Sequence, residues 1–222
     1  MAIESLIQTL AVFALPVVLA ITLHEAAHGY AALRLGDATA YMLGRVTLNP
    51  VAHIDWIGTV AMPIALFLVS GGAFLFGYAK PVPVRFDQLR HPKRDMIWVA
   101  LAGPAANLAQ AAVWIVLAYA LAASGLDEAF LVRMAGAGVL VNLALFAFNM
   151  LPLLPLDGGR VLVGLLPHRA AMQLAQTERW GLILVLLLVL VGVIGPYWML
   201  PLMHHTASVL EWLLQPLRWF LF

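Results

Sequence analysis

Uncharged apolar runs, separated by short polar segments, make up most of this chain. The first three runs cover residues 6–23, 57–76 and 96–123. An α-helix needs about 20 apolar residues to cross the hydrocarbon core of a bilayer, and these runs meet or approach that length. The pattern predicts an all-α polytopic membrane protein.

The rest of the chain adds more candidate segments. A fourth covers about 134–156, a fifth covers about 180–199, and the tail 206–222 suits a last span or an interfacial helix. In the second run, Pro63 and a Gly-Gly pair favour a re-entrant hairpin as much as a complete span. We expect about five to six transmembrane or re-entrant segments.

Residues 38–55 are not a continuous apolar run. Positions 45–48 alternate like a short strand, and Asn49-Pro50 is a turn signal. The Pro-Val-Pro-Val stretch 81–84 suits an extended edge. We expect a small β hairpin or edge strand at the membrane face, where an extended peptide could pair with it.

The composition narrows the class of protein. The chain is 64% hydrophobic and 10% charged, which excludes an ordinary soluble domain. Its net charge of +1 gives no reason to expect a nucleic-acid partner, and the absence of cysteine excludes disulfides and thiolate metal ligands. We expect a single integral membrane domain over 1–222, with a catalytic core at about 5–167 and C-terminal membrane segments at about 178–222.

The strongest chemical signal is His24-Glu25-x-x-His28 inside the first apolar segment. Residues i and i+4 share one helix face, so the two imidazoles can bind one Zn²⁺, and Glu25 is placed to act as a general base on water. The alternative is a buried His/Glu cluster with a structural role. Ionisable groups are costly in hydrocarbon and usually mark function there, which favours a metal site.

A catalytic zinc site needs a third protein ligand. Asp157 follows a long uncharged run and lies next to Pro155 and a Gly-Gly pair, which would bend the chain and direct the carboxylate inward. The alternative is that Asp157 caps a helix or pairs with Arg160. His53 is a further candidate, although a lone interfacial histidine fits a structural hydrogen-bonding group better than a ligand or acid–base group.

The positions of His24 in the first segment and Asp157 in the fourth predict how the segments cross the membrane. His24 and Asp157 share a depth only if the first and fourth segments run in the same direction, so the third should cross and the second should return to the side it left. Ten of the twelve Lys and Arg residues then lie on one face, which the positive-inside rule makes cytoplasmic. The ten residues are Arg34, Arg45, Lys80, Arg85, Arg90, Lys93, Arg94, Arg160, Arg169 and Arg179.

These motifs together resemble the site-2 protease family of intramembrane zinc metalloproteases. The likeness rests on the pairing of HExxH in a membrane helix with a late NxxPxxxLDGG, and on GRVTLNPVAHID, GYAKPVPV and LAGPAAN, which resemble the small bacterial members without a PDZ insertion. The resemblance implies His24, His28 and Asp157 as ligands and Glu25 as the catalytic base. It also implies a role for Asn149 towards the substrate or the oxyanion, whose alternative is a helix-packing amide.

The expected function is hydrolysis of peptide bonds within or near transmembrane helices of other membrane proteins, with one Zn²⁺ per chain. The expected partners are a transmembrane protein substrate and the lipid bilayer of a bacterial inner membrane, with the active site nearer the cytoplasm. The alternative is a membrane zinc-binding or transport protein without proteolytic activity. That alternative would leave Glu25 without a specific role. The same holds for a further alternative, an inactive membrane scaffold.

Overall fold

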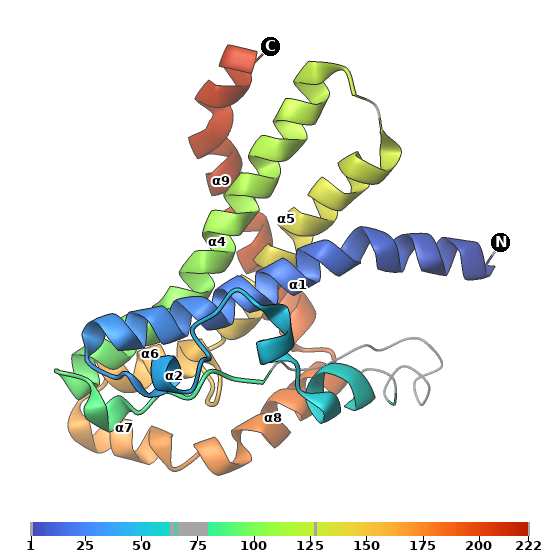
Figure 1. The fold of residues 1–222 in the computed structure, drawn as a ribbon. Helices are drawn as coiled ribbons and strands as arrows, with labels where there is room; N and C mark the ends of the chain where they lie inside the picture. The colour runs from blue at the N-terminus through green and yellow to red at the C-terminus, as the bar shows by residue number, and fades with distance from the viewer. Residues whose placement is uncertain (1, 63–64, 66–79, 127, 222) are drawn as a thin grey trace.

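The computed structural model describes residues 2–62, 65, 80–126 and 128–221, and its main elements are α-helices (Figure 1). Within these residues, α1 (Ala2–Leu35), α4 (Pro92–Ser124) and α5 (Ala129–Asn149) are long and apolar enough to cross a membrane. The number rises to four if α7 (His168–Ala175) and α8 (Glu178–Leu190), which meet at a bend of 65°, form one broken span. The prediction of an all-α membrane protein is confirmed, whereas five to six segments are not shown.

The ends of α4 follow directly from its sequence. Pro92 is the first helical residue, where its missing N–H removes no hydrogen bond. Gly125 ends the helix with a φ of 68°, a left-handed conformation that glycine adopts without a steric penalty. The long apolar stretch between these signals becomes one continuous helix despite the internal Pro104.

The helices α1, α4 and α5 cross one another closely, and α9 (Leu200–Leu221) runs beside α4 and α5 (Figure 1). Small residues allow this approach. At Gly138 of α5, a Cβ atom would lie only 2.2 Å from the ring of Trp114 on α4. The crossing therefore depends on a glycine opposite a large aromatic side chain.

The predicted fourth segment is divided into two helices. After α5 ends at Asn149 the chain turns, and α6 (Asp157–Leu165) begins at Asp157 itself. Gly158 and Gly159 pack directly on backbone atoms of the turn, since a Cβ at these residues would lie 2.3 Å and 2.4 Å from main-chain atoms of Met150 and Leu153. Asp157 thus occupies the first turn of a short helix instead of the interior of a long one.

The predicted β hairpin at 38–55 is wrong. This segment instead contains α2 (Thr39–Met42) and the 3₁₀ helix η1 (Pro50–His53), and no strand occurs among the residues that the structure describes. Local side-chain bonds explain the difference. Asn49 Oδ1 accepts from Val51 N–H at 3.1 Å, which starts the 3₁₀ turn, and the Thr47 carbonyl oxygen accepts from His53 Nε2 at 3.0 Å.

The extended stretch 81–84 likewise belongs to no β ladder. A side-chain hydrogen bond connects the start of this stretch to the 45–48 segment. Arg45 Nη2 donates to the carbonyl oxygen of Lys80 at 2.8 Å. A 3₁₀ helix, η3 (Phe86–Gln88), follows it. Of the predicted second apolar segment, the π-helix η2 (Trp56–Ala61) is described. Most of 57–76 lies outside the described residues, and so does the choice between span and re-entrant hairpin.

The C-terminal segments also differ from the predicted boundaries. The fifth segment, expected at 180–199, is interrupted after α8, where Gly192 has a φ of 78° and the π-helix η4 (Gly195–Met199) follows. The tail is one helix that begins at Leu200 and carries the exposed Trp212 and Trp219. An exposed aromatic side chain of this kind suits the membrane–water interface.

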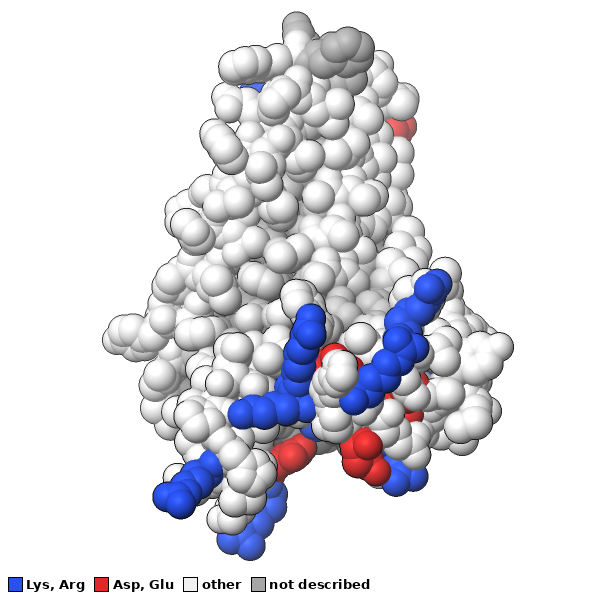
Figure 2. All heavy atoms as spheres, turned by 90° about the vertical axis from the view of Figure 1, so that its left-hand side faces the viewer, with Lys and Arg blue, Asp and Glu red and all other residues white. Residues whose placement is uncertain are grey.

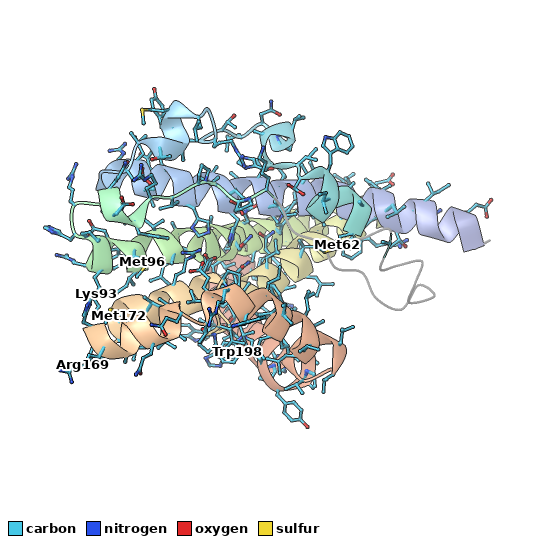
Figure 3. All side chains as sticks on the ribbon, turned by 90° about the horizontal axis from the view of Figure 1, so that it is seen from below. Met62, Lys93, Met96, Arg169, Met172 and Trp198 are labelled. Atoms are coloured by element: carbon cyan, nitrogen blue, oxygen red, sulfur yellow. The ribbon has the colours of Figure 1, made fainter. Side chains whose placement is uncertain are left out.

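Charged side chains are concentrated at one end of the molecule. Figure 2 shows most of the Lys and Arg in view gathered there, below a largely uncharged surface. Lys93 at the start of α4 and Arg169 of α7 lie at the same end (Figure 3), and Lys93 Nζ donates to the carbonyl oxygen of Leu166. This distribution is typical of a protein with one charged face at a membrane surface.

Candidate metal centre

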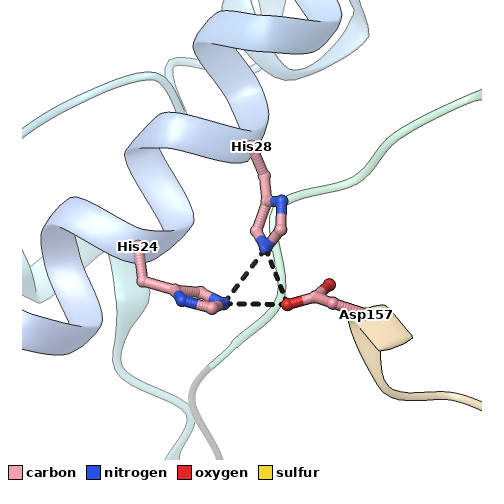
Figure 4. Close-up of side chains that lie close together, drawn as sticks. All are labelled: His24, His28 and Asp157. Atoms are coloured by element: carbon pink, nitrogen blue, oxygen red, sulfur yellow. Dashed lines mark hydrogen bonds and ion pairs between the residues drawn. The ribbon is translucent and has the colours of Figure 1, made fainter. Parts of the chain in front are cut away.

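His24, His28 and Asp157 converge where α1 meets the start of α6 (Figure 4). The two Nε2 atoms lie 3.0 Å apart, and Asp157 Oδ2 lies 3.3 Å from His24 Nε2 and 3.4 Å from His28 Nε2. Four-coordinate zinc with bonds of about 2.0–2.1 Å places its ligand atoms about 3.3 Å apart. Within the described part of the chain, this is the only such group of three side chains.

The hydrogen bonds of the two imidazoles leave both Nε2 atoms free to bind a metal. His28 Nδ1 lies 2.7 Å from the carbonyl oxygen of Val99, which can only accept, so Nδ1 carries the proton. His24 Nδ1 lies 2.6 Å from Oδ1 of Asn107. The Nδ2 atom of that amide donates elsewhere, to the Ala20 carbonyl oxygen and to Asn142 Oδ1, so His24 Nδ1 also donates.

The third ligand atom fits the same arrangement. Asp157 Oδ2 is buried and has no hydrogen-bond partner. A buried carboxylate oxygen facing two nitrogen lone pairs is unfavourable unless a cation binds all three. The donor set therefore fits a divalent metal ion, and two imidazoles with one carboxylate are a known set for catalytic zinc.

Gly103 of α4 allows the main chain to pass next to the imidazoles. A Cβ atom at this position would lie 2.3 Å from His28 Nε2 and 2.6 Å from His24. Only glycine lets α4 pass here while both rings keep their orientation. The Gly103-Pro104 pair is visible in the sequence, but its role depends on how α1 and α4 cross.

Glu25 is held by a backbone amide from the extended segment. Its Oε2 atom accepts from Val82 N–H at 2.7 Å. Because Pro81 and Pro83 have no N–H, Val82 supplies the only backbone donor of this Pro-Val-Pro stretch. One turn further along α1, Gly29 gives the stretch room, since a Cβ there would lie 3.1 Å from Val82 Cγ1.

Known proteins similar to this chain identify its family. It is 38% identical over 197 residues to the "Putative zinc metalloprotease YwhC" of Bacillus subtilis, an alignment that covers 84% of this chain and 83% of the relative. It is 28% identical to the "Putative zinc metalloprotease Rip2" of Mycolicibacterium smegmatis, covering 91% and 70%, and 32% identical to that of Mycobacterium tuberculosis, covering 76% and 62%. The chain belongs to the site-2 protease family.

This membership makes the protein an intramembrane metalloprotease of a zinc-dependent family. No family model matches the chain. No solved structure matches it either.

Asn149, the fifth candidate residue of this site-2 protease, is the last residue of α5. Its Nδ2 atom donates to the Leu145 carbonyl oxygen of the same helix at 3.0 Å, and its side chain is partly buried. That bond lies within α5, so it supports neither the oxyanion role nor the packing of α5 on another helix. A role towards the oxyanion would use the second hydrogen of this amide, because an Nδ2 group carries two.

His53 lies outside the group formed by His24, His28 and Asp157. It is 2% exposed, and its Nε2 atom donates to the Thr47 carbonyl oxygen at 3.0 Å. The bond fixes the chain between 47 and 53 beside the first helix of this site-2 protease. Its Nδ1 atom is buried and has no hydrogen-bond partner, so the structural role of His53 stays a prediction.

Sequence reasoning missed the residues that support the ligands. Asn107 and Asn142 are both fully buried and link α1, α4 and α5 through their amides. The available signal was the presence of two asparagines in otherwise uncharged membrane segments, where polar groups need partners. In this site-2 protease, the amide of Asn107 binds the candidate metal ligand His24 directly.

Proposed function

We propose that the protein hydrolyses peptide bonds within or near transmembrane helices of other membrane proteins, as a zinc endopeptidase of the site-2 type. His24, His28 and Asp157 would hold one zinc ion per chain, and Glu25 would act as the general base. The observation that carries this proposal is the convergence of two unprotonated Nε2 atoms on the unpartnered Oδ2 of Asp157.

Zinc bound there would supply a Lewis acid that polarises the scissile carbonyl group and makes water more acidic. Glu25 would take a proton from the attacking water and pass it to the leaving amine. The Val82 N–H donates to one oxygen of this carboxylate, which fixes the side chain and leaves the other oxygen for the water. Asn149 Nδ2 would serve as a second donor to the oxyanion through its second hydrogen, while the first stays on the Leu145 carbonyl oxygen.

The substrate would need to unwind before cleavage. A transmembrane helix hides its carbonyl groups in internal hydrogen bonds, so residues that weaken the helix, such as Gly and Pro, would favour cleavage near them. The segments 45–48 and 80–84 lie beside the HExxH part of α1. Both would contact the unwound stretch.

The charge distribution supports a location in a bacterial inner membrane with the basic face in the cytoplasm. That face contains Arg34 in the last turn of α1 and Lys93 in the first turn of α4. His24 lies eleven residues before the end of α1 at Leu35, or about 16 Å at 1.5 Å per residue. The site would then lie within the membrane, on its cytoplasmic side.

The proposal is tested with purified full-length protein in detergent and with Glu25→Gln as the matched variant. Glutamine can still accept the Val82 N–H, so the site should keep its shape and its zinc. We expect wild type to cleave members of a panel of single-span substrates and the variant to be about 10²–10⁴-fold slower. Bound zinc should be equal in both, and an Asp157→Asn variant should bind less.

Two results would contradict the proposal. Equal cleavage by wild type and Glu25→Gln would remove the base from the mechanism. Stoichiometric zinc without cleavage of any substrate, combined with zinc passage in proteoliposomes, would establish the metal-transport alternative.

A further inference from the structure

A groove lies between the second half of α1, the loop residues 46–48 and the middle of α4, with a volume of about 770 Å³. Its walls are almost entirely apolar, and two of them belong to α1 and α4, which are helices of membrane-spanning length. The volume is in the range of small ligand pockets and is too small for a whole helix. Its lining includes Leu23, Ala27, Leu48, Ala106, Val113 and Trp114.

Gln110 is the one amide among the lining residues, which otherwise are apolar apart from Tyr30 and Thr47. Both polar atoms of its side chain, Oε1 and Nε2, are buried and have no hydrogen-bond partner. A buried amide without partners is unfavourable, because its polar atoms lose their hydration and gain no hydrogen bond in exchange. The contrast with Asn107, three residues earlier on the same helix, is sharp, because both polar atoms of that amide are paired.

The groove is aligned with the metal centre. Gly103, Ala106, Gln110 and Val113 follow one another at helical spacing along one face of α4, and Gly103 is the residue in contact with His24 and His28. Gln110 is seven residues from Gly103, or about 10 Å along the helix axis. An extended peptide covers that distance with about three residues.

We propose that this groove holds the unwound apolar stretch of the substrate, and that Gln110 pairs with a substrate peptide group about three residues from the scissile bond. A primary amide offers one acceptor and two donor hydrogens, so it can accept from a backbone N–H and donate to the C=O of the same residue. Unwinding within the membrane exposes such a pair of groups with no water to bind them. A lipid acyl chain could fill the volume but could not pair with the amide.

This inference rests on the proposed proteolytic function and assigns Gln110 a positioning role. The groove accounts for specificity as well, because its walls favour apolar side chains on either side of the paired residue. A polar or charged residue placed there would lose its hydration without gaining a partner.

Cysteine cross-linking tests the position directly, because the wild-type chain contains no cysteine. The probe is a synthetic single-span peptide of Leu and Val with a central Gly-Pro and terminal lysines, which wild type is first shown to cleave. Peptides that carry one activated-disulfide cysteine, each at a different position, are then added to a protein with two substitutions, Glu25→Gln and Gln110→Cys. The control carries Leu140→Cys, an exposed apolar position on α5.

We expect cross-links at position 110 with peptide residues about three from the cleavage point, and competition by unlabelled peptide. Equal labelling at position 140, or no labelling at 110, overturns the inference while the proteolytic function stands. If wild type cleaves no such peptide or other single-span substrate, the proposed function fails first, and this inference fails with it.

Kinetics give a second test. Gln110→Leu should lower kcat/KM by about 10- to 100-fold through KM. Bound zinc should be unchanged and Tm should not fall, since no hydrogen bond within the protein is lost and an unpaired buried amide is removed. Gln173→Leu, which changes an exposed glutamine on α7, should leave kcat/KM unchanged. A lower Tm with unchanged KM in Gln110→Leu would show a purely structural role and overturn the assignment.

Discussion

His24 Nδ1 donates a hydrogen bond to Asn107 Oδ1 over 2.6 Å, and this contact joins a candidate metal ligand on α1 to the middle of α4. The same amide donates to Ala20 on α1 and to Asn142 on α5. Three membrane helices therefore determine the tautomer and orientation of one imidazole. Outer hydrogen bonds of this kind tune both the basicity and the position of a metal ligand.

Replacing Asn107 with leucine should weaken metal binding without removing any ligand. We expect Asn107→Leu to lose about 10- to 100-fold in zinc affinity, measured by competition with a chelator. Asn107→Asp keeps an acceptor for His24 Nδ1 and should bind zinc more tightly than the leucine variant. Wild-type affinity in Asn107→Leu would show that this contact does not matter for the metal.

Gly103→Ala should damage the site although alanine favours helices. A new Cβ would meet His28 Nε2 at 2.3 Å, so the rings or α4 must move, and we expect both zinc content and cleavage to fall at least tenfold. Gly136→Ala on α5 is the matched control, because its Cβ would meet no atom within 4 Å. Equal zinc content in the two variants would contradict the observed closeness of α4.

The hydrogen bond from Val82 to Glu25 should affect kcat but not zinc binding. Val82→Pro removes the N–H that holds Glu25 Oε2, so the carboxylate should lose its fixed orientation, and kcat should fall about tenfold while zinc binding stays unchanged. Val82→Ala keeps the N–H and loses only side-chain packing. If both variants lose the same activity, the side chain matters and the backbone donor does not.

The Asp37 carboxylate links the end of α1 to Arg85, after the 81–84 stretch, and its hydrogen bonds should make the stability of the fold depend on pH. Its Oδ1 accepts from Thr39 N–H at 2.9 Å and its Oδ2 from Arg85 N–H at 2.6 Å. Burial raises the pKa of Asp37, but these hydrogen bonds outweigh burial and hold it below its usual 3.8. A lowered pKa stabilises the folded protein above about pH 4, and this contribution is lost as the pH falls through the folded-state pKa.

We therefore expect wild type to lose Tm more steeply than Asp37→Asn between pH 5 and about pH 3. Thermal unfolding in detergent measures this difference, and the other carboxyl groups contribute equally to both proteins. Parallel curves for the two proteins would show that Asp37 gains nothing from its charge in the folded state.

The sequence predicted those parts of the site that depend on local spacing. His24 and His28 come together because i and i+4 share a helix face, and Asp157 was identifiable from the helix-breaking residues around it. The hairpin prediction failed because Asn49 and His53 satisfy nearby backbone groups that a β ladder would have used. Such competition between local bonds and a ladder is not visible in an alternating pattern.

The supporting parts of the site depend on how distant segments meet. The need for glycine at 103 arises only when α4 crosses α1, and the donor to Glu25 is a backbone atom that any residue except proline carries. Asn107 could be recognised as an unusual polar residue, but its partner His24 is 83 positions away. No periodicity within one segment contains that information.

The contact between α8 and the turn before Asp157 affects when the metal centre can form during translation. A Cβ at Gly181 of α8 would lie 1.8 Å from the Leu154 carbonyl oxygen, so α8 rests directly on the turn that positions the third ligand. That helix follows the turn in the chain and leaves the ribosome after it. We therefore expect the nascent chain to lack a fully formed metal centre, and hence proteolytic activity, until α8 has been translated and packed.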